Sequence, residues 1–589
     1  MSDVPLGYDP LSAVYASAPT VSKPRSSLAV ALEQTRNRLL VTAAVVSLAF
    51  TAIAVKLVDA TLLRSGSEPR QTLAAEAHAS PVSRADIVDR NGNLLATSLA
   101  TASLHADPKV VIDPKEAARK LISVLPELDY KELVEKLSGD KRFVWIKRNL
   151  TPRQQYQVHR LGVPGLYFER EERRFYPATS LASHVIGFTG VDNNGLAGIE
   201  QQFDKRLRSD PRPLQLSLDL RLQHVLKKEI AATMAEFRAL GAAGMVYNVR
   251  TGEVLAMVSL PDFDPHNPTG LDENTLFNRN TLGVYEMGST FKIFNSAMAL
   301  ESGKVRLHDS FDATHSIQIG RHTISDFHGK NRWLTVAEVF QHSSNIGSVR
   351  MALTAGIPTQ RAFMQKMGFM RPTPLELPEN GWPLVPNPWR EVNAMTISFG
   401  HGISVSPMHT VAAAAATING GMMHPPTLLK RDPAEEIPGE RVISPQTSET
   451  MRRLLRLVVT EGTAKTADAP GYIVGGKTGT ADKQKGRSYS QNARLSSFVG
   501  AFPMHDPQYM VFVMVDEPKA TAKTFGYATG GWVAAPAAGR IIRQIGPLLG
   551  VQPVDPNAPE IINATALNPP GTTTRGSTVA SVPPPARPH

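Results

Sequence analysis

The chain has 589 residues, with 63 Lys and Arg against 53 Asp and Glu, 42% hydrophobic residues and no Cys. This length and mixture indicate several folded domains and exclude a collagen, a coiled coil and wholesale disorder. The absence of Cys excludes disulfides, a thiol nucleophile and Cys-ligated metal centres, while the net charge of +10 suits an anionic membrane or polymer as well as nucleic acid.

The first element in chain order is an apolar segment. Residues 39–55 form a run of 17 residues without a charge, and Lys56 could extend its amine to the membrane interface while apolar residues prolong the helix. We predict one transmembrane helix. The alternatives are a buried core helix and a cleaved signal peptide, although a 38-residue leader is too long for the latter. Three basic residues flank the run on each side, so the positive-inside rule gives no orientation.

Hydrophobic periodicity predicts the elements of the second half. Apolar residues at helical spacing indicate a helix over residues 221–240, ended by Gly241. An antiparallel hairpin follows, and two late strands would extend the same sheet. Helical patterns lie between the two strand groups, which favours an α+β domain over a parallel Rossmann-like one. The predicted strands are residues 243–249, 254–259, 495–502 and 509–515.

The first chemical motif is Gly288-Ser289-Thr290-Phe291-Lys292, at the start of a predicted helix. Ser289 and Lys292 are three residues apart and share a helix face, so the amine can reach the hydroxyl. A Ser hydroxyl needs an adjacent base, and Lys is one only when burial or a second cation destabilises its ammonium form. The motif is weak by itself, because Ser138 and Lys141 match it in a stretch that is typical of a solvated loop.

A second motif, Ser343-Ser344-Asn345, follows a short helix that starts with a capping-box pattern. It could place a hydroxyl and a carboxamide at the mouth of a cleft, and ordinary helix-end capping explains it equally well.

The third motif is Lys477-Thr478-Gly479-Thr480, which precedes the two late strands. On an edge strand, Gly479 would let a substrate backbone approach closely, and neighbouring N–H groups would stay free to donate. Lys477 would add the cation that a substrate carboxylate and a neutral Lys292 both require. Chance matches to this motif are rarer than chance matches to the first two.

In this order, Ser289-x-x-Lys292, Ser343-x-Asn345 and Lys477-Thr478-Gly479 resemble the three motifs of penicillin-binding proteins and serine β-lactamases. The gaps of 54 and 134 residues make the set far more specific than any one motif. Upstream segments resemble signatures of class B penicillin-binding proteins. Two other segments, around Trp333 and around His401, are most similar to the cell-division branch. The upstream segments are Arg84-Ala85-Asp86-Ile87-Val88-Asp89-Arg90-Asn91-Gly92, Arg174-Phe175-Tyr176-Pro177, Gly195-Leu196-Ala197-Gly198-Ile199-Glu200 and Leu216-Ser217-Leu218-Asp219.

The resemblance implies an α+β fold and a domain order. We expect a transpeptidase domain of the penicillin-binding, serine β-lactamase-like type, an antiparallel sheet flanked by helices, after an elongated α+β pedestal and one N-terminal transmembrane helix. Several charged pedestal residues could form internal ion pairs, namely Arg84, Asp89, Arg90, Arg174 and Glu200. The expected segments are 1–38, cytoplasmic; 39–60, membrane anchor; 61–235, periplasmic pedestal of the dimerisation type; 236–550, transpeptidase domain; and 551–589, a disordered tail rich in Pro.

The resemblance also implies an activity, that of a serine-type D-Ala-D-Ala transpeptidase which cross-links peptidoglycan stem peptides in the septal wall. Ser289 would be the nucleophile, Lys292 the general base, Ser343 a proton relay to the leaving amine and Asn345 an amide anchor. The strand motif, Lys477, Thr478, Gly479 and Thr480, would face the terminal carboxylate. Backbone N–H groups of Ser289 and Thr480 would stabilise the oxyanion. β-Lactams, which mimic the dipeptide end, should acylate Ser289.

Two other functions stay open. One is a carboxypeptidase or β-lactamase, for which Glu376-Leu377-Pro378-Glu379-Asn380 is a loose match to a water-activating element, although we expect a surface loop there. The other is a non-catalytic scaffold that senses β-lactams or recruits division proteins.

No cofactor or metal is expected, because His322 and His328 lack the spacing of a helical metal site. No nucleic-acid recognition motif is found. The partners implied by the resemblance are stem peptides ending in D-Ala-D-Ala, β-lactam antibiotics, the membrane, a glycan polymerase and other division proteins. The implied location is a single pass through the inner membrane with the catalytic domain in the periplasm.

Overall fold

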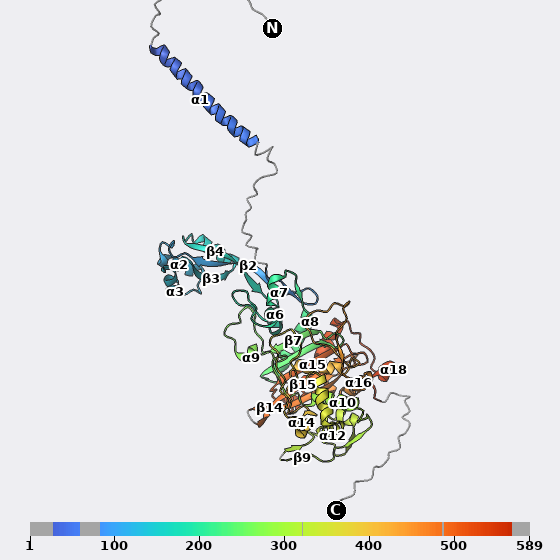
Figure 1. Ribbon diagram of the computed structural model, residues 1–589. Helices are drawn as coiled ribbons and strands as arrows, with labels where there is room; N and C mark the ends of the chain where they lie inside the picture. The colour runs from blue at the N-terminus through green and yellow to red at the C-terminus, as the bar shows by residue number, and fades with distance from the viewer. Residues whose placement is uncertain (1–26, 59–82, 321, 486–487, 568–589) are drawn as a thin grey trace, which may run out of the picture. The chain divides into compact units, whose positions relative to one another are not determined.

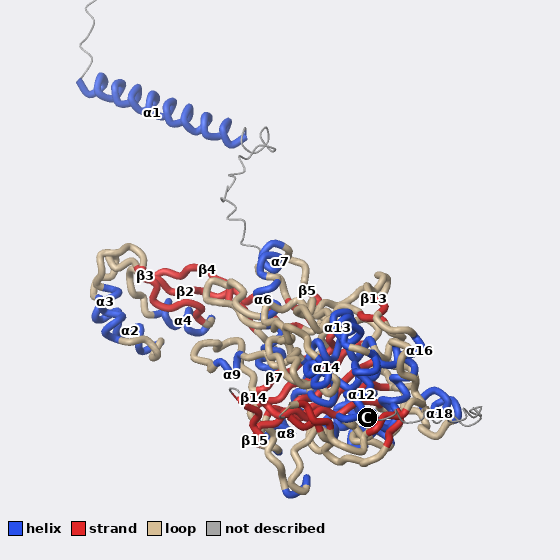
Figure 2. Tube along the Cα trace, turned by 60° about the horizontal axis from the view of Figure 1, so that its bottom comes forward, coloured by secondary structure: helices blue, strands red, loops and turns tan. Residues whose placement is uncertain are grey.

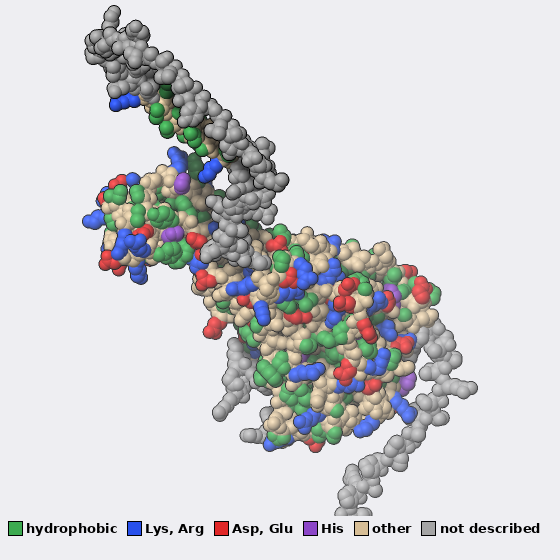
Figure 3. All heavy atoms as spheres, turned by 45° about the horizontal axis from the view of Figure 1, so that its top comes forward, with side chains coloured by type: hydrophobic (Ala, Val, Ile, Leu, Met, Phe, Trp, Pro, Cys, Tyr) green, Lys and Arg blue, Asp and Glu red, His purple; other side chains and the backbone are tan. Residues whose placement is uncertain are grey.

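The computed structural model describes residues 27–58, 83–320, 322–485 and 488–567. The chain divides into two compact units, Met1–Pro81 and Val82–His589. The first unit contains one long helix, α1 (Ser27–Val58), shown in Figure 1. Its span Arg38–Lys56 is long and apolar enough to cross a membrane, and Figure 3 shows hydrophobic side chains along it. Thr42 and Thr51 donate their hydroxyls to carbonyls one turn earlier, at 2.8 and 2.7 Å, so the polar side chains are satisfied within the helix.

The second unit starts with a five-stranded sheet in which the long strand β2 (Leu94–Ala106) pairs with β3 (Val144–Leu150) and β4 (Leu166–Phe175), both antiparallel. The helices α2, α3 and α4 share one hydrophobic core with these strands. Figure 1 shows α2 and α3 beside the strands. The core includes Leu104, Leu121, Leu133 and Leu150. The remaining elements of this region are β1 (Ile87–Val88), α2 (Pro114–Val124), α3 (Tyr130–Leu137), α4 (Pro152–Arg160), η2 (Thr179–Ala182), α5 (Ser183–Ile186), α6 (Gly198–Gln202), α7 (Asp204–Ser209) and β5 (Leu214–Gln215).

Glu200 is the centre of a buried charge cluster at the base of this sheet. Its two carboxylate oxygens accept hydrogen bonds from Arg84 and Arg174, each at 2.6 Å, and all three side chains are almost fully buried. The expected internal ion pairs are therefore confirmed for these three residues. Asp89 was expected to join them and does not: its carboxylate accepts backbone N–H groups of the following turn, at 2.8 and 2.9 Å, because that tight turn leaves its own donors unpaired.

The sheet of the C-terminal region has five strands in the order β14-β15-β16-β6-β7, all antiparallel. The predicted hairpin is confirmed as β6 (Gly241–Asn248) and β7 (Val254–Leu260), and the late strands are confirmed as β15 (Ser488–Phe502) and β16 (Tyr509–Asp516). Almost every residue of β6, β7 and β16 is buried, so both faces of the sheet are covered. The strand that carries the third motif, β14 (Gly475–Lys485), is at an edge.

Helices from the two ends of this region pack together on the sheet. Helix α8 (Leu220–Glu236) contacts α17 (Ala534–Leu548), β6 and β7, so it packs with this sheet although the predicted boundary placed it in the pedestal. The helix predicted to run to residue 240 ends at Glu236, because Arg238 takes a left-handed φ of 46°. Gly241, predicted as the helix stop, is instead the first residue of β6.

The helices between β7 and β14 carry the first two motifs. Figure 2 shows α12, α13 and α14 grouped together. The elements of this part are α9 (Glu273–Leu276), η3 (Gly288–Phe291), α10 (Lys292–Glu301), β8 (Ser310–Asp312), β9 (Ile317–Ile319), β10 (His322–Ile324), β11 (Trp333–Thr335), α11 (Val336–Gln341), α12 (Asn345–Ala355), α13 (Ile357–Lys366), α14 (Glu391–Ile397), α15 (Pro407–Ala416), β12 (Met422–Met423), β13 (Glu440–Arg441), α16 (Pro445–Thr460) and η4 (Lys465–Ala467).

The start of the predicted tail is folded. Val551 and Ile561 are 7% and 5% exposed and belong to the main hydrophobic core, and α18 (Pro559–Thr565) contacts α16. The prediction of disorder is therefore wrong for residues 551–567, because composition does not reveal that a few apolar side chains can join the core of a folded domain. The rest of that prediction, residues 568–589, lies outside the described residues. A short element, η5 (Ala522–Thr524), completes the fold.

Candidate active site

Ser289 and Lys292 lie at the start of one helix, as the spacing predicts. The helix opens with a 3-10 turn, η3, that carries Ser289, and Lys292 is the first residue of α10. The amine Nζ of Lys292 is 2.9 Å from the hydroxyl Oγ of Ser289, and the Lys292 side chain is 1% exposed. Gly400 packs directly against this turn and accepts the backbone N–H of Gly288 at 3.2 Å. A Cβ added at Gly400 would lie 2.0 Å from the carbonyl oxygen of Gly288, so only glycine fits there.

Four oxygen atoms surround the amine of Lys292. Besides Ser289 Oγ, they are the backbone carbonyl of Ser343 at 2.7 Å, the Ser343 hydroxyl at 3.1 Å and Asn345 Oδ1 at 2.7 Å. Carbonyl oxygens can only accept, so they occupy the two N–H groups of a neutral amine. The nitrogen lone pair is then left for a hydroxyl. The arrangement thus favours an amine that accepts a proton from Ser289 or Ser343.

Burial is the main reason that Lys292 can be neutral. Desolvation lowers the pKa of Lys292 well below its usual value, and the nearby Lys477 lowers this pKa further, while Asp326 acts in the opposite direction. Lys477 is itself fully buried, and desolvation lowers its pKa to about 7. Two adjacent buried lysines are not readily protonated together, so the geometry favours a neutral amine at Lys292, which is the form that a general base requires.

The second motif connects the two lysines. Ser343 has a left-handed φ of 58° at the turn between α11 and α12, and its hydroxyl lies 3.1 Å from Lys292 Nζ and 3.0 Å from Lys477 Nζ. Both helix-capping functions predicted for this region are present: Thr335 forms the capping box of α11, and Ser344 caps α12. One segment therefore combines the helix cap, Ser344, with two neighbours that contact the amine of Lys292.

The third motif lies on the edge strand β14, as predicted. Thr478 and Thr480 line the cleft, and their hydroxyls contact Thr463 Oγ1 at 2.8 Å and the backbone N–H of Gly530 at 3.1 Å. Packing inside the protein also requires a glycine at position 479, which the sequence did not suggest. A Cβ there would lie 2.4 Å from Ser497 Oγ, and the turn that carries Ser289 could not pack so closely on the strand.

These three motifs meet in one open cleft of about 840 Å³. Sequence reasoning missed several residues that line it, because isolated residues that belong to no motif have no spacing or periodicity to mark them. They include Asp326, Thr463, Arg494, Tyr527 and Trp532.

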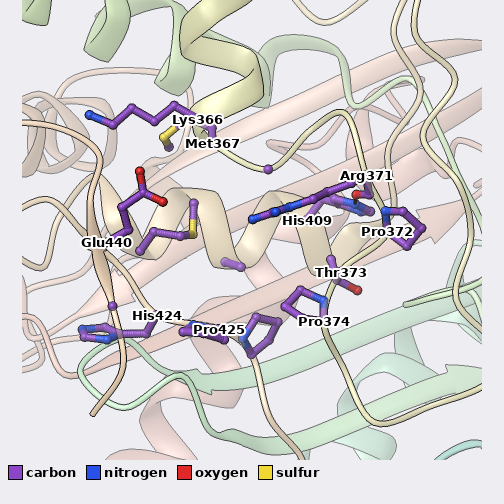
Figure 4. Close-up of a pocket in the computed structure, with 15 residues that line it drawn as sticks. Lys366, Met367, Arg371, Pro372, Thr373, Pro374, His409, His424, Pro425 and Glu440 are labelled. Atoms are coloured by element: carbon purple, nitrogen blue, oxygen red, sulfur yellow. Dashed lines mark hydrogen bonds between the residues drawn. The ribbon is translucent and has the colours of Figure 1, made fainter. Parts of the chain in front are cut away.

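A second cavity, of about 220 Å³, is shown in Figure 4. It is lined by Pro372, Pro374 and Pro425 together with Arg371 and His424, and it contains none of the residues predicted for the site.

The residues behind the hydrolase alternative lie elsewhere. Glu376 accepts hydrogen bonds from the hydroxyl of Thr427 and the backbone N–H of Leu428, at 2.6 and 2.8 Å, and Glu379 accepts from the N–H of Gly198 at 3.1 Å. The segment is an irregular loop, as expected, although the side chains of Glu376 and Glu379 are partly buried and hydrogen-bonded. Of the two histidines considered for a metal, His328 lines the cleft beside the ring of Phe327.

Comparison with known proteins identifies the two regions. Residues 242–543 match the penicillin-binding protein transpeptidase domain, and residues 79–219 match the penicillin-binding protein dimerisation domain. A probable peptidoglycan D,D-transpeptidase, FtsI, of Caulobacter vibrioides is 41% identical over 80% of this chain and 82% of its own length. The peptidoglycan D,D-transpeptidase FtsI of Escherichia coli K12 is 30% identical over 81% of this chain and 85% of its own length.

Solved structures agree on the fold. The crystal structure of penicillin-binding protein 3 from Mycobacterium tuberculosis, complexed with aztreonam, superposes with a TM-score of 0.64 at 24% identity and covers 81% of this chain and 98% of its own. Helix α8 lies between the two matched regions and packs on the second. The matched pair of domains, the three motifs in one cleft and the identity to these relatives together show that this chain belongs to the penicillin-binding protein transpeptidase family, in its class B form.

Proposed function

We propose that this chain cross-links peptidoglycan stem peptides through an acyl-enzyme formed on Ser289. It is a serine-type peptidoglycan D,D-transpeptidase of the FtsI type, and β-lactams are its inhibitors. The observation that carries the assignment to Ser289 is the environment of Lys292, whose amine lies 2.9 Å from that hydroxyl while two carbonyl oxygens at 2.7 Å take its N–H groups.

In the first half-reaction, Ser289 Oγ attacks the carbonyl carbon of the penultimate D-Ala, and Lys292 takes the hydroxyl proton. The oxyanion is stabilised by the backbone N–H groups of Ser289 and Thr480; loss of one such donor typically raises the barrier by about 3 to 4 kcal/mol. The carbon–nitrogen bond then breaks, and the proton passes through Ser343 to the amine of the departing D-Ala. An ester between the peptide and Ser289 remains.

In the second half-reaction, an amine of a neighbouring stem peptide attacks the ester. Lys292 accepts the proton of that amine and returns a proton to Ser289 Oγ as the new peptide bond forms. Asn345 anchors the peptide amide of the donor strand. The hydroxyls of Thr478 and Thr480 face the terminal carboxylate from the cleft, and the buried amine of Lys477 keeps the local electrostatic field positive.

The chain is further proposed to act in the septal wall, anchored by α1 as a single pass in the inner membrane with the catalytic region in the periplasm. This rests on the apolar span Arg38–Lys56 and on the relatives, whose names place them among the FtsI proteins. A glycan polymerase and other division proteins are proposed as partners on the same grounds. The end of the membrane anchor near residue 60 is proposed with them.

Mass spectrometry after incubation with penicillin tests the assignment of Ser289. The expected result is one penicillin adduct on the peptide that contains Ser289, and no adduct in Ser289→Ala. Ser138→Ala is the matched control, because Ser138 precedes Lys141 with the same spacing on an exposed segment at the end of α3. Labelling that persists in Ser289→Ala would refute the assignment. In cells, a pure scaffold would still support septation with Ser289→Ala, and a transpeptidase would not.

A further inference from the structure

Asp326 makes the contacts that fix the second motif in place. It lies in the loop after β10, 17 residues before Ser343, and its side chain lines the cleft. One carboxylate oxygen accepts the backbone N–H groups of Asn345 and Ile346, at 2.5 and 3.1 Å, and the other accepts the hydroxyl of Ser344 at 2.7 Å. One side chain therefore holds three donors at the start of α12.

The neighbouring residue holds the side chain of Asn345. The amide nitrogen Nδ2 of Asn345 donates to the backbone carbonyl of Ser325 at 2.9 Å, which leaves Oδ1 to face Lys292 at 2.7 Å. Residues 325 and 326 thus fix both the backbone and the amide orientation of Asn345.

This anchoring matters because the turn it holds is strained. Ser343 has a left-handed φ of 58°, which a residue with a Cβ adopts only when its surroundings impose it. The strained turn places the carbonyl and hydroxyl of Ser343 on Lys292 and the same hydroxyl on Lys477. A carboxylate that binds the next residues of the chain supplies part of that constraint.

We propose that Asp326 is a positioning residue for the acylation step, which holds Ser343 and Asn345 in contact with the amine of Lys292. It does not touch the reacting atoms itself. The inference rests on the proposed acylation of Ser289, and it names a residue outside the three motifs on which the rate of that step depends.

Charge provides a signature that a merely structural role would not have. The ionisable groups that face Lys292 are Lys477 on β14, Asp326, and His401 after α14. Asp326 raises the pKa of Lys292, whereas burial and Lys477 lower it. Removing the negative charge therefore lowers this pKa, and the pH at which the base becomes neutral falls with it.

The test measures the acylation rate constant and the dissociation constant for penicillin separately, from pH 6 to 10, on the full-length protein in detergent. Asp326→Asn is expected to lower the rate constant at least tenfold, since a displacement of about 1 Å in a catalytic constellation costs up to about 100-fold. The dissociation constant should change less than the rate constant, and the ascending limb of the pH profile should move to lower pH. All rates are referred to the fraction of protein that penicillin can acylate.

Two further variants separate placement from charge. Asp326→Glu keeps the charge but moves the carboxylate, so its rate constant should fall while the limb stays at its wild-type pH. Asp113→Asn is the matched control: Asp113 accepts two backbone N–H groups at the start of α2, remote from the cleft, and its loss should leave both constants unchanged. If Asp326→Asn does not fold, Asp326→Glu decides.

A wild-type acylation rate constant in either Asp326→Asn or Asp326→Glu would overturn the inference. So would an ascending limb of the pH profile that stays at its wild-type pH in Asp326→Asn. Either result would leave the assignment of Ser289 intact. If the wild-type protein itself forms no adduct, the proposed function fails instead. The two failures are therefore distinguishable within one set of measurements.

Discussion

Replacing Lys477 by Met should make the protein more stable and less active at neutral pH. The side chain of Lys477 is fully buried, and desolvation lowers its pKa from 10.5 to about 7. At or below pH 7 the folded protein carries a charge that it accommodates poorly, and a shift of this size corresponds to about 5 kcal/mol of lost stability. Met has a similar length, adapts its shape to the cavity and carries no charge.

Part of that gain is offset by lost hydrogen bonds. The amine of Lys477 contacts the Ser343 hydroxyl at 3.0 Å and the carbonyl of Thr478 at 3.3 Å, and each such bond contributes about 1 kcal/mol. The net gain in the free energy of unfolding is then about 3 kcal/mol at pH 7 or below. The matched transpeptidase domain spans residues 242–543. With about 2.1 cal/mol/K per residue of unfolding entropy, a gain of this size raises its midpoint temperature of unfolding by roughly 5 °C.

The sign of the pH dependence follows from proton counting. Between about pH 7 and 10.5 the unfolded wild-type chain holds the proton of Lys477 and the folded chain does not, so wild-type stability rises with pH. The variant lacks this rise. Its advantage should shrink above pH 7 and reverse at about pH 9, where the remaining protonation penalty equals the lost hydrogen bonds.

The assay is thermal unfolding of the purified protein at pH 6, 7.5, 9 and 10, together with penicillin acylation under the same conditions. Acylation should be slower in Lys477→Met, and its ascending limb should move to higher pH because Lys477 lowers the pKa of Lys292. Lys483→Met is the control, since Lys483 is on the same strand but pairs with Asp516 and Glu517. A variant less stable than wild type at pH 6, or a difference that does not shrink toward pH 10, would refute the reasoning.

Three other substitutions probe the site and the pedestal. Gly479→Ala places a Cβ 2.4 Å from Ser497 Oγ, so it should destabilise the protein by about 1 to 3 kcal/mol and lower the acylation rate about 100-fold, as thermal unfolding and penicillin labelling would show. Glu200→Gln leaves the buried Arg174 without its carboxylate partner and Arg84 with Asp204 alone; unfolding should be about 3 to 5 kcal/mol easier, and unchanged stability would contradict a buried cluster. Glu376→Gln should not alter the release rate of bound penicillin, because Glu376 is engaged by Thr427; slower release would revive the hydrolase alternative.

The sequence by itself determined the chemistry of the site and the type of fold. A spacing of three residues is enough to place Ser289 and Lys292 on one helix face, since the helical repeat is fixed by the backbone. Two strand-like runs joined by a short turn likewise predicted the hairpin of β6 and β7, which the structure confirms. Local rules of this kind hold wherever neighbouring residues in the chain are also neighbours in space.

Long-range packing decided the rest. The gap of 134 residues between Ser343 and Lys477 carries no information about distance, yet the fold brings the hydroxyl and the amine to 3.0 Å. The role of Asp326, the packing reason for Gly479 and the burial of Ile561 were equally invisible, because each depends on which surface a side chain meets. Tertiary structure also set the proton affinities, since the pKa of a lysine depends on the water removed around it and on the charges brought near it.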